Sequence, residues 1–428
     1  MNSTAFGALF LLACATVSPA RAADQTVPGA ANADAVRVAD GSPLVRESLQ
    51  FLRHQALAIR DRALRQETLD ATTNPETCVR HRAGLSAAGT QAILDRLLAE
   101  GLYSASDAAV FPGGATAGIL PPVLEDGSPC PKLPQPFRSA PGSSFGGHHS
   151  MPGGLPIHEA FNEKSDVSLA ENYARNYRVP GLPGDDDHGG DHGHAFPGLN
   201  EDVVLAAPIW HDWAKSIVFQ WNADGSEFKE FNFGGNGATD AFGAAGDSRT
   251  GGHHIMSVAE AMARGLAPDM VITQASAHST PTGGNEYKVV NWLRAAAIMA
   301  RLDPVAAGYL HRDAAGNLRL PPLRRLGEVN LESAAPPQTN FLPEYVIHNL
   351  SDADFILTGP VVTESETILR TLAPRYGFDP TDVARYNWSF RNVALAQLSA
   401  ERIAFVYQRG GLAAVRAELD VLRSRGVL

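Results

Sequence analysis

Apolar residues recur at helical spacing in several separate stretches of this chain, and few stretches alternate as a half-buried strand does. The first helical stretch covers residues 42–70, with Ser42 as a candidate N-cap before Pro43, and the second covers residues 86–103 and starts at Ser86. Further helical segments follow from residue 158 to about residue 304, and the chain closes with helical runs at 365–377 and 392–425. The pattern therefore predicts an all-α fold with no internal repeat.

The N-terminus resembles a secretory signal peptide. An apolar run from Ala5 to Val17 precedes Ala20-Arg21-Ala22, a small-x-small pattern typical of a cleavage site, although the run has no preceding Lys or Arg. We expect residues 1–22 to be removed and the mature chain to be periplasmic or secreted. The alternative is a lipoprotein signal in which Cys14 is lipidated.

Loss of residues 1–22 leaves two of the three cysteines, Cys78 and Cys130. In an oxidising compartment these two thiols can form a disulfide, and the alternative is two unpaired thiols.

Composition and charge narrow the classes of partner. The chain has 428 residues, of which 44% are hydrophobic and 19% charged, and this composition is typical of a globular protein. Its formal net charge is −11 and no Lys/Arg cluster stands out, which argues against binding of duplex nucleic acid. No other apolar run is long enough to cross a membrane, so we expect no transmembrane segment in the mature chain.

The candidate chemistry lies in the histidines, of which the chain has 14. Several occur in local groups, and histidine with aspartate suits Zn, Fe or Mn. Ligands of this kind from separate helices can converge in the core of a bundle. The groups are His148, His149 and His158; the adjacent pair His211-Asp212, followed by Lys215; His253 and His254; and His278. A loop rich in Asp, His and Gly at 184–194 is expected to be a solvated insertion, with loose metal capture or a lid as the alternatives.

The order His, His-Asp, His, His resembles the HD-domain superfamily of metal-dependent phosphohydrolases, an all-helical fold. "LAAPIWHDWAKS" is similar to the family's apolar helix that ends in His-Asp-x-x-Lys, and "HHSMPGGLPIHEAFN" resembles its Gly-Gly turn before the first ligand. "HHIMSVAEAMARGLAPDMVITQASAH" matches the segment with a histidine at its head, a Gly-Leu-x-Pro turn and a second histidine. Aligning Pro268 with that turn puts His254, rather than His253, in the ligand register. The resemblance covers roughly residues 145–305.

The resemblance implies a site and an activity. It implies two divalent transition-metal ions (Zn, Mn or Fe) and hydrolysis of a small phosphoester or nucleotide through a metal-activated hydroxide. Asp212 and Lys215 are the implied catalytic residues, and Lys215 would face the phosphate. The implied metal ligands are His158, His211, Asp212, His254 and His278, with His149, His253 and Asn291 as further candidates.

The implied organisation places an HD-like metal-binding core at residues 145–310. The flanking parts are an N-terminal helical region at 23–144, which includes a long Pro/Gly-rich loop, and a C-terminal helical region at 311–428.

One departure from the family pattern concerns the metal number. The family closes its ligand set with an aspartate on the helix after the last histidine, but Asn291 and Arg294 stand near that place. Asn291 can still offer a carbonyl oxygen, or a compensating acid can come from Asp352 or Asp354.

Two other functions use the same residues. Some proteins with a similar fold hold a di-iron pair and oxidise a C–H bond with O₂, and the histidine-rich set also suits iron. Alternatively, the chain is a non-catalytic secreted protein that binds a metal or a partner, and the altered closing position reflects lost catalysis.

Overall fold

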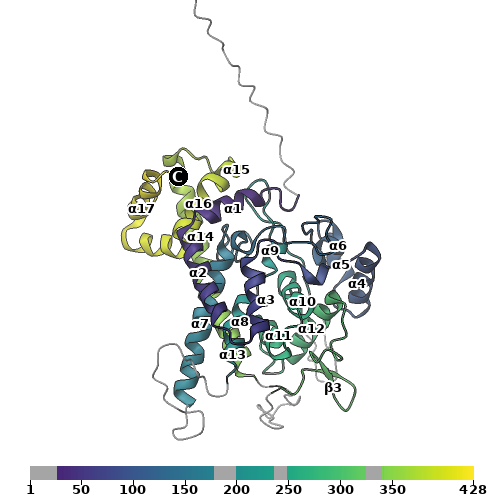
Figure 1. Ribbon diagram of the computed structural model, residues 1–428. Coiled ribbons are helices and arrows are strands. Elements are labelled where there is room, and N and C mark those ends of the chain that lie inside the picture. Colours follow the sequence, from purple (N-terminus) through teal and green to yellow (C-terminus); the bar gives the residue numbers. More distant parts are fainter. Residues whose placement is uncertain (1–26, 178–198, 236–247, 324–339, 341) are drawn as a thin grey trace, which may run out of the picture.

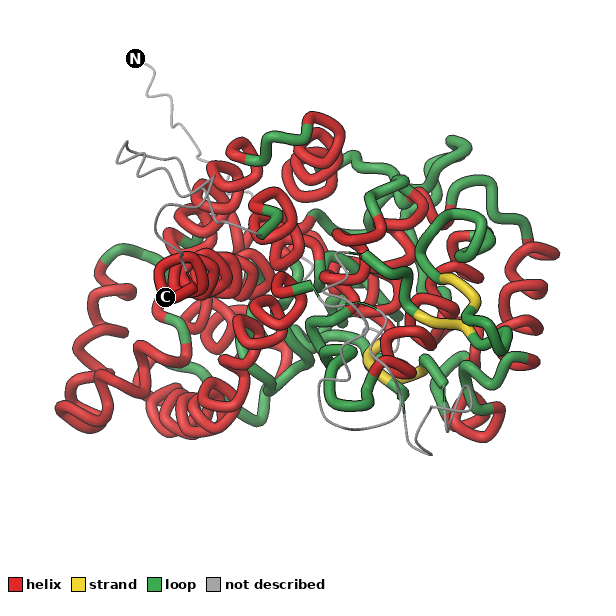
Figure 2. Tube along the Cα trace, turned by 90° about the horizontal axis from the view of Figure 1, so that it is seen from below, coloured by secondary structure: helices red, strands yellow, loops and turns green. Residues whose placement is uncertain are grey.

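The computed structural model describes residues 27–177, 199–235, 248–323, 340 and 342–428 (Figure 1). The fold is 62% helix and 4% strand, which is consistent with the predicted all-α class. Figure 2 shows the strands as short segments among the helices. The signal peptide predicted at 1–22 and the Asp/His-rich loop at 184–194 lie outside the described residues.

Helices α1 to α9 build the first half of the chain. Their bounds are α1 (Asn32–Gly41), α2 (Pro43–Ala58), α3 (Arg62–Thr73), α4 (Ala87–Ala99), α5 (Ala105–Val110), α6 (Gly114–Ile119), α7 (Gly154–Tyr177), α8 (Glu201–Trp210) and α9 (Lys215–Val218). Two 3₁₀ turns, η1 (Arg80–Arg82) and η2 (Phe137–Ser139), interrupt the connections.

The second half adds the remaining helices and two short antiparallel pairs. The helices are α10 (Gly252–Ala263), α11 (Pro268–Ala275), α12 (Glu286–Ala300), α13 (Pro343–Ser351), α14 (Phe355–Leu372), α15 (Val383–Tyr386), α16 (Asn392–Leu398) and α17 (Ala400–Ser424). Between them lie the 3₁₀ turns η3 (Asp352–Asp354) and η4 (Ala373–Tyr376) and the π-helical turn η5 (Asn387–Arg391). Strand β1 (Asn232–Phe233) pairs with β2 (Thr250–Gly251), and β3 (His311–Arg312) pairs with β4 (Leu318–Arg319).

Local sequence signals set the starts of α2 and α4 as predicted, whereas the helical stretch predicted at 42–70 is divided into α2 and α3. The Ser42 side chain accepts a hydrogen bond from the backbone N–H of Val45 at the start of α2, directly before Pro43. Ser86 does the same for the N–H of Gly89 at the start of α4. Both predicted N-caps are confirmed.

Two large hydrophobic cores organise the described residues, and a third, small cluster lies between α7, α8 and α13. The larger core includes α8 and α10 to α12, and α7 packs against α2, α8 and α13 beside it. The smaller core joins α14, α16 and α17 to α1, and Figure 1 shows α1 next to α16 although they lie at opposite ends of the sequence. The domain boundaries proposed at 144 and 310 stay predictions.

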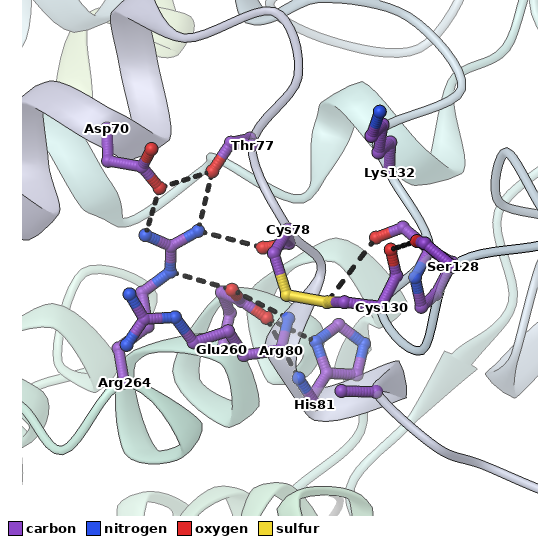
Figure 3. Close-up of a disulfide and its surroundings, with 12 residues drawn as sticks. Asp70, Thr77, Cys78, Arg80, His81, Ser128, Cys130, Lys132, Glu260 and Arg264 are labelled. Atoms are coloured by element: carbon purple, nitrogen blue, oxygen red, sulfur yellow. Dashed lines mark hydrogen bonds and ion pairs between the residues drawn. A yellow bond between two sulfur atoms is a disulfide. The ribbon is translucent and has the colours of Figure 1, made fainter. Parts of the chain in front are cut away.

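Cys78 and Cys130 form a disulfide, with their Cα atoms 5.6 Å apart, so the predicted pairing is confirmed (Figure 3). Next to it, the carboxylate of Glu260 accepts hydrogen bonds from the backbone N–H groups of Arg80 and His81. Arg264 donates to Glu260 and to the carbonyl of Cys78. This buried network attaches α10 to the disulfide-bearing segment.

Candidate metal centre

The His211-Asp212 pair follows the apolar helix α8, whose residues from Ala206 to Trp210 are all buried. His211 is the C-cap of α8, and Asp212 lies in the turn before α9, which begins at Lys215. Because the helix is buried on all sides, its end carries both side chains into the protein interior. His211 is fully buried and Asp212 is 1% exposed.

The first group of potential ligands gathers on one oxygen of Asp212. The Nε2 atoms of His158 and His211 each lie 3.2 Å from the Oδ2 of Asp212. Asp352 in η3 completes this side, since its Oδ1 lies 3.3 Å from the His158 Nε2 and 3.4 Å from the His211 Nε2. The sequence analysis offered Asp352 as a compensating acid, and the structure places it there.

The second group gathers on the other oxygen of Asp212. The Nε2 of His253, in the first turn of α10, lies 3.0 Å from the Oδ1 of Asp212. His278, which follows α11, offers a nitrogen within 4.8 Å of the ligand atoms of Asp212 and His253. Asp212 therefore belongs to both groups, and it joins them through its two oxygens.

Neighbouring oxygens occupy the Nδ1 side of three of these rings. The His211 Nδ1 faces Glu159 at 3.1 Å and the carbonyl of Pro208 at 2.9 Å. The His253 Nδ1 contacts the carboxylate of Glu230, and the His278 Nδ1 lies 2.7 Å from the Thr250 hydroxyl. Partners of this kind fix the ring orientation of metal-binding histidines and leave Nε2 available.

Several buried polar atoms of these residues lack a hydrogen-bond partner, and such atoms indicate whether the residues suit a cation. Within the described residues, no hydrogen bond satisfies the Nε2 of His211, the Nε2 of His253 or the Oδ1 of Asp212, and the two imidazole nitrogens meet Asp212 only as ion pairs. Such atoms are costly in a protein interior unless something pairs with them. Nitrogen and carboxylate oxygen are the donors that Zn, Fe and Mn accept, so these buried His/Asp clusters suit a metal ion.

The electrostatics of the cluster favour the charged carboxylates. Burial opposes ionisation of Asp212, but His211 and Lys215 outweigh it and hold the Asp212 pKa well below its usual range. Asp352 behaves in the same way beside His211 and His158. Burial also opposes the charge on His158 and on His253, but the neighbouring carboxylates raise the pKa of each to about 9.

Lys215, a predicted catalytic residue, is 4% exposed and forms an ion pair with the Oδ2 of Asp212. Its ammonium also donates a hydrogen bond to the carbonyl of Gly142. Burial disfavours the charge of Lys215, but Asp212 outweighs it and raises the pKa. The lysine therefore carries a positive charge at the point where the two groups meet.

The structure does not bring two of the candidate ligands into these groups. The His254 Nε2 lies 3.0 Å from the carbonyl of Ala275, and its ring stacks on His278 at 4.2 Å between centroids. His253, given as a further candidate, takes the place beside Asp212. The Asn291 side chain is engaged at both ends, since its Nδ2 donates to the Ser248 hydroxyl and its Oδ1 accepts from Arg294.

A third group lies on the other side of His158. It consists of His148, His158 and Asp354, with the Asp354 Oδ1 3.9 Å from the His158 Nδ1. His149, a further candidate ligand, has a positive φ of 50° and places its Nε2 3.3 Å from the Oδ2 of Asp354. His149 thus lies beside the centre, where its ring packs 5.7 Å from that of His158.

Sequence reasoning missed several residues that surround the centre. Glu159 and Glu230 hold histidine rings, and the Asn162 Nδ2 donates to the Oδ1 of Asp352 at 3.1 Å. His348 on α13 packs its ring 5.0 Å from that of His211. Glu159 directly follows a predicted ligand, and that adjacency was the one available signal. Glu230 follows no motif that the sequence analysis used.

A pocket of about 450 Å³ opens onto the centre. Its polar wall includes Lys215 and members of both ligand groups, and Phe219 and Phe355 contribute apolar surface. The lining residues from the two groups are His158, Asp212, Asp352, His253 and His278. His148 also lines it, and burial, followed by the nearby positive charges, lowers the His148 pKa to about 2. The pocket is large enough for a small molecule that contacts the metal ligands directly.

Comparisons with known proteins leave the family open. No protein-family model, no curated protein and no solved structure matches the chain. Among the described residues, no helix combines the length and the apolar character needed to span a membrane.

Proposed function

We propose that this chain is a metal-dependent phosphohydrolase whose HD-like core binds two divalent cations on either side of Asp212. One observation carries the proposal: the two oxygens of Asp212 face different histidine groups, at 3.2 Å from the His211 Nε2 and 3.0 Å from the His253 Nε2. A carboxylate in this position can bridge two cations, and paired cations are common in enzymes that hydrolyse phosphate esters.

The side chains divide into two ligand sets. Asp352 would join the first set, in place of the closing aspartate that the HD resemblance leads one to expect on α12. We assign the first cation to His158, His211, Asp212 and Asp352, and the second to Asp212, His253 and His278.

A bound divalent transition ion would polarise a phosphoryl oxygen and lower the pKa of its bound water to about 7. The chain supplies the rest of the chemistry. Lys215 offers a fixed positive charge at the pocket wall, where it stabilises negative charge on the phosphoryl oxygens. Glu159 and Glu230 hold the rings of His211 and His253, so these ligands need no reorientation when the substrate arrives.

The proposal includes a periplasmic or secreted location and a small phosphoester or nucleotide as substrate. The disulfide between Cys78 and Cys130 supports the location, since such bonds form and persist in oxidising compartments. A pocket of about 450 Å³ supports a substrate of small-molecule size.

The test is to measure metal content and phosphoester hydrolysis together. The purified protein is analysed for bound metals and assayed with bis(4-nitrophenyl) phosphate and 4-nitrophenyl phosphate. Asp212→Ala is compared with Asp34→Ala, which removes a carboxylate from an exposed ion pair on α1. We expect two ions and turnover in the parent and in Asp34→Ala, and loss of both in Asp212→Ala.

Other outcomes would contradict the proposal. Bound metal without turnover of either ester would favour the binding protein. Bound iron with substrate-dependent O₂ uptake, and no hydrolysis, would favour the oxygenase. Full hydrolysis by Asp212→Ala would remove Asp212 from the mechanism.

A further inference from the structure

A second pocket, of about 670 Å³, lies between α4, the end of α12 and the β3–β4 pair. Its charged lining consists of four arginines and two acids: Arg96, Arg294, Arg301, Arg312, Glu100 and Asp303. We call it the arginine pocket. The lining carries an excess of positive charge, although the whole chain has a net charge of −11.

The two acids do not neutralise the four guanidinium groups. Glu100 pairs with two arginines at once. Its Oε1 accepts a hydrogen bond from the Arg96 Nε and its Oε2 accepts one from Arg294, each at 2.9 Å. The Oδ1 of Asp303 accepts hydrogen bonds from the backbone N–H groups of Val305 and Ala306. Asp303 therefore caps a turn and shares its charge with the backbone.

Arg301 and Arg312 bond to the main chain. Arg301 donates to the carbonyl of Ala83 and Arg312 to that of Gly316. Within the described residues, neither of the two lies within ion-pair distance of a carboxylate, although the charge of Arg312 acts on Asp303 across the pocket. Two guanidinium groups thus keep N–H donors for a ligand.

The backbone of Arg301 gives an independent indication. This residue directly follows α12 with a φ of 58°, in the left-handed region where glycine is the usual residue at a helix C-terminus. An arginine there costs conformational free energy, and such strained residues cluster at ligand sites.

Arg294 is already oriented for binding. Glu100 holds one end of its guanidinium, and the Asn291 Oδ1 accepts from the other at 2.9 Å. Asn291 and Arg294 are the residues that replaced the expected closing aspartate. The structure places Arg294 on the wall of the arginine pocket, with Asn291 behind it, rather than in the metal centre.

We propose that the arginine pocket binds a polyvalent oxyanion, specifically a phosphorylated small molecule with at least two negative charges. The planar guanidinium group of an arginine can donate two parallel, charge-assisted hydrogen bonds to two oxygens of one phosphate. Two negative charges balance the excess of two positive charges in the lining. The volume lies within the range of small-molecule sites. The proposal does not depend on the activity of the metal centre.

The test is calorimetric titration of the full chain with inorganic pyrophosphate at low ionic strength. Because pyrophosphate also binds metals, the titration is repeated on Asp212→Ala. We expect binding to persist in that variant and to weaken at least tenfold when Arg312→Ala or Arg96→Ala is added. Both arginines are exposed, so their loss should leave the fold intact, and thermal melting checks this. Arg416→Ala removes an exposed arginine on α17 and should leave the affinity unchanged.

Three results would overturn the proposal. The first is no heat of binding in Asp212→Ala, and the second is an unchanged affinity in both arginine variants. The third is tighter binding of citrate than of pyrophosphate, because it would assign the pocket to a polycarboxylate instead of a phosphate.

Discussion

The carboxylate of Asp212 separates two histidines that come from different helices, with its Oδ2 3.2 Å from the His211 Nε2 and its Oδ1 3.0 Å from the His253 Nε2. Asparagine at this position keeps the shape but has only one carbonyl oxygen. We therefore expect Asp212→Asn to lose at least one of two bound ions. Hydrolysis should fall about a thousandfold, since the contribution of a metal is several kcal/mol. Metal analysis and steady-state rates measure both, and retention of both ions would refute the bridging role.

The adjacent histidines at the start of α10 should differ in their effect on the metal. His253→Ala should remove the second ion, because the His253 Nε2 faces Asp212. His254→Ala should keep both ions and lower the free energy of unfolding instead, because His254 packs against His278 and Trp292. Metal analysis and urea denaturation of the two variants distinguish these results. The opposite pattern would restore His254 as the ligand.

Glu230 is expected to act on the metal through His253. Its carboxylate contacts the His253 Nδ1 and also accepts a hydrogen bond from the His253 backbone N–H at 2.8 Å. Glu230→Gln should weaken metal affinity by about 10- to 100-fold, the usual effect of losing such a partner. Competition with a chelator of known affinity measures the change. Glu47→Gln, at an exposed position on α2, is the matched control and should leave the affinity unchanged.

Stability should fall in acid because of the buried contact between Glu260 and His81. Burial opposes the charge of Glu260, but His81 and Arg264 lower its pKa to about 2 from 4.5, so its stabilising effect is complete above pH 4.5 and is lost as the pH falls towards 2. Burial lowers the His81 pKa below 6.5, so the folded state also loses stability as the pH falls below 6.5. Both shifts act in the same direction.

The matching experiment compares the parent with Glu260→Gln. The variant leaves the buried guanidinium of Arg264 without this carboxylate and should cost about 3–5 kcal/mol at neutral pH. Its urea midpoint should then change less than that of the parent between pH 4.5 and pH 3. Equal pH dependence in the two proteins would show that Glu260 is not responsible.

The disulfide should contribute to stability through the unfolded chain. Cys78 and Cys130 are separated by 52 positions, and closing a loop of this length corresponds to about 4 kcal/mol in the chain-entropy model. The double variant Cys78→Ser, Cys130→Ser should show this loss in urea denaturation. The same denaturation of the parent under reducing conditions is the control. A variant as stable as the oxidised parent would contradict the expectation.

The sequence predicted the features that depend on neighbouring residues. Ser42 and Ser86 cap their helices because a cap involves only the next few positions. The apolar run before His211-Asp212 was expected to form a helix that ends at this pair, and α8 ends there. The helical class also follows from local periodicity.

The remaining site residues depend on packing between distant segments. Asp352 lies on a 3₁₀ turn after α13, and no spacing rule links it to His158 or His211. The choice between His253 and His254 needs the rotation of α10 about its axis, because consecutive helical residues differ by about 100°. The packing of α10 against α12 sets that rotation.

The ion pair between Lys215 and Asp212 bears on whether the chain can fold before it binds a metal. Because the Lys215 ammonium contacts Asp212, the chain itself neutralises a carboxylate that is only 1% exposed. Under the proposed function, the chain would therefore fold without an uncompensated charge at this position before any metal binds. A bound cation would take over the contact with Asp212 and leave the Lys215 ammonium for the substrate.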